Sequence, residues 1–161
     1  MKAYLDEFKE TVDAAFERLM LISEEQSRVP RGEGKWSSKE IIGHLIDSAA
    51  NNHARFVQAQ LHDGFVFSGY EQDKWVTVQA YNDEPWDRLL QLWRHYNLHL
   101  LHVMSLIGEE VSGKLRSPHN LHQIAWRAVA EEQPVTLDYL MRDYVDHLKH
   151  HLGQISSSVV L

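Results

Sequence analysis

The chain has 161 residues, among them 16 Lys or Arg and 23 Asp or Glu, which gives a formal net charge of -7 at pH 7. Because no stretch concentrates basic residues against successive phosphates, we expect no nucleic-acid partner. No apolar run approaches the roughly 20 residues of a membrane-spanning helix, and the first residues lack the apolar core of a signal peptide. We therefore expect no membrane partner and a cytoplasmic location.

The composition is that of an ordinary globular domain. With 43% hydrophobic and 24% charged residues, the chain can bury one core, and we expect a single domain spanning residues 1–161. The sequence has no cysteine but 11 histidines. Disulfides and thiolate ligands are therefore excluded, and any metal site must use His, carboxylate or water.

Apolar residues recur at helical spacing in four long segments, and little in the sequence favours strands. We predict helices at about 3–27, 37–62, 85–107 and 136–155. The apolar stripe of the first helix consists of Leu5, Phe8, Val12, Phe16, Leu19 and Met20. The pattern predicts an all-α fold.

Three of these helices carry start signals. Ser37 and Glu40 have the spacing of a capping box, in which each side chain bonds the backbone N–H of the other residue. Pro85 suits the first position of the third helix, because its missing N–H would be unsatisfied there. Thr136 is the expected cap of the last helix.

Two long connections separate the predicted helices. Residues 63–84 are rich in Gly, Asp and aromatic side chains, and we expect a short helix plus loop there. A crossover of this length allows the second and third helices to run parallel. Residues 109–135 are less regular, and either a short helix or a β-hairpin over Leu121 to Val135 is compatible with them.

Histidine pairs four residues apart occur twice, and this spacing places both rings on one helix face. His95 and His99 lie opposite the apolar stripe of the third helix, as does His102, so we interpret them as solvated. His147 and His151 instead flank the stripe of the last helix on the same side. They are either metal ligands or half-buried histidines that bond neighbouring groups, whereas the neighbouring His150 points to the surface.

The second helix carries a polar row opposite its apolar face. The row consists of Glu40, His44, Asp47, Asn51 and Arg55. Periodicity alone suggests that His44 is solvated, but such a set of groups could instead line a cleft that faces the last helix. The spacing does not decide between the two.

Two motifs resemble the DinB/YfiT-like family of metalloenzymes. Residues 36–47 follow the pattern W-S-x-x-E-x-x-G-H-L-x-D, and residues 147–155 follow H-x-x-x-H-x-x-Q-I. The resemblance spans nearly the whole chain and implies a four-helix bundle with long crossover connections. It also implies a metal held by one histidine of the second helix and two of the last.

Carried over by position, the implied ligands are His44, His147 and His151. The ion expected from the resemblance is a divalent transition metal, zinc or nickel, which suits imidazole ligands. Asp47 and Asp143 are then candidates to act as general base or to hold an imidazole or a bound water. For each, a plain surface role is the alternative.

The same polar groups suggest further roles around this site. Asn51 and Gln154 are candidates to hold an imidazole N–H or a bound water, and a surface role is again the alternative. Asn51 and Arg55 are candidates for substrate binding. No residue is assigned to an organic cofactor.

Three functions are compatible with this site. The first is thiol (S-)transferase chemistry on a small electrophile, because family branches related to this chain use bacillithiol or mycothiol. The second is hydrolysis of a small ester or amide by a metal-activated water, and the third is a non-catalytic metal-binding protein. The expected partners are a small-molecule substrate, a low-molecular-weight thiol and, through exposed aromatics such as Trp75 and Trp126, a second copy of the chain.

Overall fold

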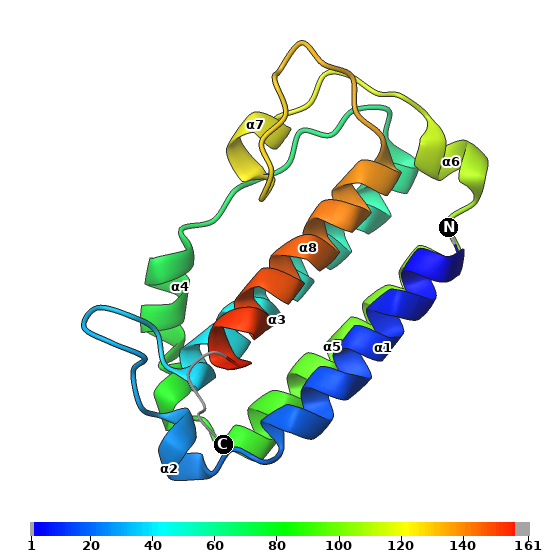
Figure 1. Cartoon of the computed structure of the whole chain (residues 1–161). Coiled ribbons are helices and arrows are strands. Elements are labelled where there is room, and N and C mark those ends of the chain that lie inside the picture. Colours follow the sequence, from blue (N-terminus) through cyan, green and yellow to red (C-terminus); the bar gives the residue numbers. More distant parts are fainter. Residues whose placement is uncertain (1, 157–161) are drawn as a thin grey trace.

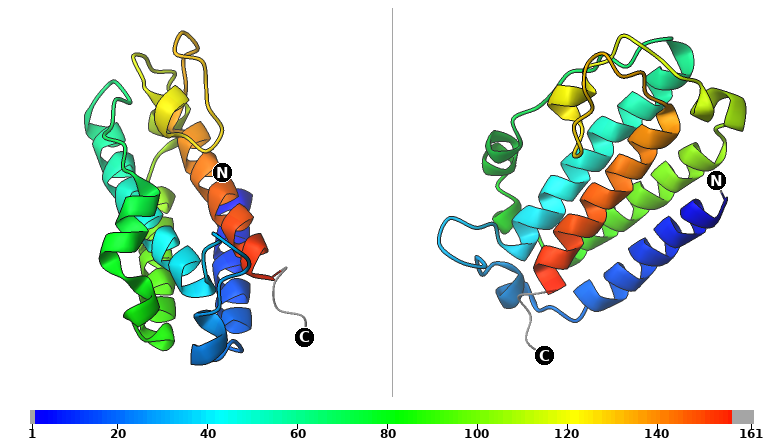
Figure 2. Two further views of the ribbon diagram at one scale, coloured as in Figure 1. Left: turned by 90° about the vertical axis from the view of Figure 1, so that its left-hand side faces the viewer. Right: turned by 45° about the horizontal axis from the view of Figure 1, so that its top comes forward.

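The computed structural model describes residues 2–156 and contains four long helices that lie side by side (Figures 1 and 2). These are α1 (Lys2–Leu19), α3 (Ser38–Leu61), α5 (Trp86–Ser105) and α8 (Leu137–Ser156). The short helices are α2 (Glu24–Ser27), α4 (Gln72–Gln79), α6 (Glu109–Gly113), α7 (Leu121–Ile124) and a 3₁₀ turn at Tyr81–Asp83. The predicted all-α four-helix bundle is confirmed. No helix in this part of the chain combines the length and the apolar character needed to cross a membrane.

The chain direction in the bundle follows from its connections. The colours of Figure 1 show that α3 and α5 run in the same direction, with α1 and α8 opposed to them. Helices α3 and α5 can run parallel because the crossover that contains α4 brings the chain back to the end of the bundle where α3 begins, as predicted. Helix α3 lies between α5 and α8, so it is buried on two sides and exposes little of its first half.

The first predicted helix is too long. Helix α1 ends at Leu19 and a separate helix, α2, starts after Ser23. The Ser23 side chain accepts the N–H of Gln26 at 3.2 Å, and the Gln26 side chain accepts the N–H of Ser23 at 2.9 Å. This second capping box begins a new helix, and it was missed because the apolar spacing continues past Leu19.

The predicted N-terminal caps of α3 and α8 are confirmed. The reciprocal Ser37 and Glu40 bonds are 3.2 Å and 2.7 Å long. Thr136 Oγ1 accepts the N–H of Tyr139 at 3.1 Å. Helix α5 begins at Trp86, so Pro85 occupies the N-cap position and not the first helical position that was predicted for it.

Within residues 109–135 the structure has short helices and no β-hairpin. Helix α7 spans Leu121–Ile124. The extended pieces form only isolated bridges, in which Arg116 pairs with Val135 and Phe65 pairs with His119. The Phe65–His119 bridge joins the two long connections over one end of the α3 and α8 pair, and the Arg116–Val135 bridge joins two parts of the second connection (Figure 2).

Candidate metal centre

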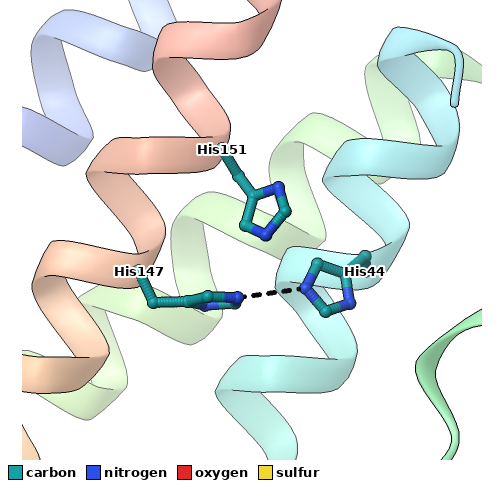
Figure 3. Close-up of side chains that lie close together, drawn as sticks. All are labelled: His44, His147 and His151. Carbon is teal, nitrogen blue, oxygen red and sulfur yellow. Dashed lines mark hydrogen bonds between the residues drawn. The ribbon is translucent and has the colours of Figure 1, made fainter. Parts of the chain in front are cut away.

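Three imidazoles meet between α3 and α8 (Figure 3). His44 comes from α3, and His147 and His151 come from successive turns of α8. The Nε2 atoms of His44 and His147 are 3.3 Å apart, and one nitrogen of each of the three rings lies within 4.8 Å of the other two. Among residues 2–156, this is the one cluster of three or more His, Cys or carboxylate groups with such spacing.

His44 is buried, with 1% of its surface exposed. The periodicity of the second predicted helix suggested that His44 is solvated, because a periodicity argument assumes that a helix has one buried face. In the structure α3 packs against both α5 and α8, and of the polar row His44 and Arg55 line the cavity beside α8, whereas Glu40, Asp47 and Asn51 do not. The alternative of a cleft facing the last helix is therefore correct for His44 and Arg55 and wrong for the other three residues of the row.

The ligand set fits a divalent ion. Two nitrogens at about 2.05 Å from a tetrahedral ion are about 3.3 Å apart, and the His44 and His147 Nε2 atoms have this separation. His151 Nδ1 lies 3.1 Å from Gln154 Oε1, and His147 Nδ1 lies 3.4 Å from Ser48 Oγ. These bonds occupy the Nδ1 side of both α8 rings, so the Nε2 atoms can be ligands. The Nδ1 atom of His44 is buried without a partner among the described residues.

Burial favours the neutral form of these rings. Burial, together with a smaller effect of the neighbouring imidazoles, lowers the pKa of both His44 and His147 to about 3. Burial also lowers the pKa of His151, although its bond with Gln154 opposes this. Neutral imidazole is the form that binds metals, so the three rings are ready for an ion at neutral pH.

These shifts predict an acid-sensitive metal-free protein. His44 and His147 take up protons near pH 6.5 in the unfolded chain and only near pH 3 in the folded chain, so the free energy of unfolding should fall between these values as pH is lowered. The expected slope is on the order of 1 kcal/mol per pH unit for each ring. Urea unfolding of chelator-treated protein at pH 7.5, 6 and 5 measures it. His147→Asn should reduce the slope and the exposed His95→Asn should not; equal slopes in both variants would contradict the assignment.

Two tryptophans enclose the imidazoles. The half-buried Trp36 ring lies 5.1 Å from the His44 ring and 6.3 Å from that of His151, measured between centroids. The Trp126 ring lies 5.5 Å from His147 and 4.5 Å from His150. Trp126 is 45% exposed, but it covers the histidine cluster and is not a detached surface aromatic. The homodimer remains a prediction.

A cavity of about 330 Å³ opens beside the histidines. Its α3 wall is a stripe at spacings of four, four and three residues, formed by His44, Ser48, Asn52 and Arg55. Helix α8 and the segments around Tyr70 and Trp126 supply the other walls. The remaining lining residues are Gly69, Tyr70, Gln72, Gln123, Ile124, Ala125, Trp126, Leu140, Asp143, Tyr144, His147 and His151. The three imidazoles therefore border a space large enough for a small molecule.

The family model of the DinB superfamily matches residues 5–155 of the chain. The protein belongs to the DinB superfamily.

Two further comparisons agree with this DinB assignment. The chain is 22% identical over 157 residues to a protein of Geobacillus thermodenitrificans (strain NG80-2) named "Putative metal-dependent hydrolase", covering 98% of this chain and 83% of the other. It also resembles the solved structure of YfiT from Bacillus subtilis, with a TM-score of 0.75, 17% identity and coverage of 97% and 84%. That protein is described as "a probable metal-dependent hydrolase with an unusual four-helix bundle topology". At this identity the structural likeness shows the fold.

The motif at the start of α3 in this DinB protein is explained by local contacts. Ser37 donates a hydrogen bond from its Oγ to Asn82 at 2.8 Å, in addition to capping the helix. Gly43 lies against the Tyr81 ring so closely that a Cβ at this position would overlap it. The hydroxyl of Tyr81 donates to Asp47 Oδ1 at 2.7 Å. The motif therefore holds the 3₁₀ turn at Tyr81–Asp83 against the helix that carries His44.

The two carboxylates proposed for catalysis have structural partners. Asp143 lines the cavity, but its oxygens accept the backbone N–H groups of Trp126 and Arg127 at 2.8 Å and 2.7 Å. Asp47 is not among the lining residues, and Gln79 adds a second bond to the oxygen that Tyr81 already holds. Burial raises the pKa of both carboxyls despite these bonds. Asp143 fixes the loop that carries Trp126, and Asp47 fixes Tyr81.

The two residues proposed for substrate binding differ in position. Arg55 lines the cavity, whereas Asn51 does not and donates its amide N–H to the carbonyl of Asp47 one turn earlier. The neighbouring Asn52 lines the cavity in its place. Sequence reasoning also missed Ser48 and Tyr70. The spacing from His44 to Ser48, Asn52 and Arg55 was available in the sequence, but it becomes meaningful only once the stripe is known to face α8.

Proposed function

We propose that the protein is a metal-dependent enzyme whose zinc or nickel ion is bound by His44, His147 and His151. The observation that carries the proposal is the 3.3 Å separation of the His44 and His147 Nε2 atoms, with the His151 ring completing the cluster. The names of the Geobacillus and Bacillus relatives, both of which mention metal-dependent hydrolases, support it.

A purely structural ion is the weaker alternative. Structural zinc sites usually have four protein ligands, whereas the cluster in the described part of the chain offers three. The cluster also borders a cavity with polar walls. Three ligands beside a cavity are the arrangement of a site that leaves one position for a small molecule.

When bound here, a divalent ion would act as a Lewis acid that lowers the pKa of a coordinated thiol or water. The described residues that line the cavity include no carboxylate free of hydrogen bonds that could remove a proton, because both oxygens of Asp143 are bonded and Asp47 lies outside the cavity. A thiol loses its proton far more readily than water, so it needs such a base less. This favours transfer of a low-molecular-weight thiol to a small electrophile, in which sulfur bonds to carbon and the proton leaves with the displaced group.

Hydrolysis is the second candidate, because it is the activity in the names of the two relatives. It would use the same ion and cavity with water as the nucleophile. The residues lining the cavity suit either reaction, since Ser48, Asn52 and Tyr70 can orient a substrate without taking part in proton transfer.

One substrate tests both reactions. Zinc- or nickel-loaded protein is incubated with p-nitrophenyl acetate, with and without N-acetylcysteine, and release of p-nitrophenol is compared with the spontaneous rate. Thiol transfer predicts that catalysed release appears only with the thiol and yields the acetyl thioester, at about tenfold or more above background. The same release without thiol would favour hydrolysis. Chelator-treated protein and the His147→Ala variant should show only the spontaneous rate.

A further inference from the structure

At the end of the cavity away from the histidines lies Arg55, a buried cation with no carboxylate hydrogen-bonded to it among the described residues. Arg55 has 6% of its surface exposed. Of its five N–H groups, one has a protein acceptor among the described residues, the carbonyl of Ser68 at 3.2 Å. Burying a guanidinium is costly unless it is paired, so this arrangement needs a physical reason.

The one carboxylate in the cavity wall attracts Arg55 but forms no hydrogen bond with it among the described residues. Asp143 is the only carboxylate among the residues that line the cavity, and its two oxygens accept the backbone N–H groups of Trp126 and Arg127, not the N–H groups of Arg55. Arg55 is the only Lys or Arg in the same lining. The cavity therefore contains one guanidinium whose N–H groups are mostly left without a protein acceptor among the described residues, in a protein whose net charge is -7.

A second donor lies close to it. Tyr70 also lines the cavity. The positive charge of Arg55 attracts the ionised form of the Tyr70 phenol and so acts to lower its pKa. Burial and the nearby Asp47 nevertheless raise the pKa of Tyr70 to about 12. The phenol therefore keeps its proton at neutral pH and can donate a hydrogen bond to an oxyanion beside Arg55.

We propose that Arg55 binds a carboxylate of the substrate, so that the enzyme acts on small molecules with a carboxylate at one end and the reacting group at the other. A guanidinium matches a carboxylate with two parallel N–H bonds. A single buried cation neutralises one negative charge, which favours a monoanion over a phosphate dianion. His44 and Arg55 are 11 residues apart, about 16 Å along the helix axis, so the two groups of the substrate are several bonds apart. The inference that the bound carboxylate belongs to the substrate rests on the proposed function. The inference that the pocket binds a carboxylate is independent of it.

The test compares an acid with its uncharged isostere. Phenylacetate and phenylacetamide are titrated into zinc-loaded and into chelator-treated full-length protein, with binding followed by ¹H–¹⁵N NMR. We expect phenylacetate to bind about tenfold or more tightly than the amide in both forms. Arg55→Met should remove the preference and Arg55→Lys should keep part of it. Arg127→Met is the matched control, because Arg127 lies near the cavity but pairs with Asp146 on the surface, and it should keep the full preference.

The results separate this proposal from the metal site. Equal affinity for acid and amide in the wild-type protein would overturn it without need of any variant. A preference that survives in Arg55→Met, or that disappears whenever zinc is removed, would also overturn it, since the anion would then bind elsewhere. Tighter binding of inorganic phosphate than of phenylacetate would overturn the carboxylate assignment. A preference for the acid in protein that fails to bind zinc would support Arg55 while contradicting the metal centre.

Discussion

Replacing His147 with alanine is expected to abolish tight binding of zinc or nickel while the helical bundle remains folded. The residue supplies one of the three nitrogens in the cluster, and its Nε2 atom is 3.3 Å from that of His44. Loss of a group that only supports a ligand typically weakens metal binding 10- to 100-fold, so loss of a ligand should weaken it by more than about 100-fold. Elemental analysis after dialysis, together with titration of the metal, measures the effect.

Two histidines outside the cluster, one on α8 and one on α5, make the experiment specific. His150→Ala removes an exposed ring of α8 that contacts Trp126 but lies outside the cluster. His99→Ala removes an exposed ring of α5. Both variants should bind one ion per chain, as the wild type does, whereas His44→Ala should behave like His147→Ala. Equal loss in all four variants would show that the cluster is not the binding site. Circular dichroism confirms that each variant is folded.

Gly43→Ala is expected to destabilise the protein strongly, although alanine is the better helix former. A Cβ on Gly43 would overlap the Tyr81 ring close to its attachment point, so the ring cannot move aside without its backbone. Displacing Tyr81 would also break its hydrogen bond to Asp47. Overpacking of this kind costs about 3 kcal/mol or more when neither partner can yield. The midpoint of urea unfolding gives the change in stability.

Another helical glycine provides the control for Gly43→Ala. A Cβ on Gly153 in α8 meets nothing within 4 Å in the described part of the chain, so Gly153→Ala should be neutral or stabilise by up to about 1 kcal/mol. If the Tyr81 clash is the cause, adding Tyr81→Ala to Gly43→Ala should recover part of the lost stability. A Gly43→Ala variant as stable as the wild type would contradict the close approach of α3 and Tyr81.

The helices were predictable because their signals are local. The capping box of Ser37 and Glu40, the cap at Thr136 and the apolar periodicity each depend on residues within a few positions of one another. The same locality explains the error at Leu19, where apolar spacing continued across a break that Ser23 creates. The long connections were predicted only in outline, since their bridges join residues as far apart as Phe65 and His119.

The site was less accessible to sequence reasoning, because it depends on which helices face one another. The spacing of His147 and His151 is local and indicated a shared face, but the burial of His44 follows from the packing of α3 between two helices. Periodicity cannot show that. The roles of Asp47 and Asn51 were missed for the same reason: Tyr81 holds Asp47 from 34 positions away, and Asn51 lies beside the stripe that lines the cavity.

The most direct test of the metal centre is a crystal structure of zinc-loaded protein, with anomalous scattering measured on both sides of the zinc absorption edge. We predict one peak between α3 and α8, about 2.0–2.1 Å from the Nε2 atoms of His44, His147 and His151, with the remaining position open to the cavity. A peak bound by other residues, or three rings that diverge around no ion, would contradict the proposed centre.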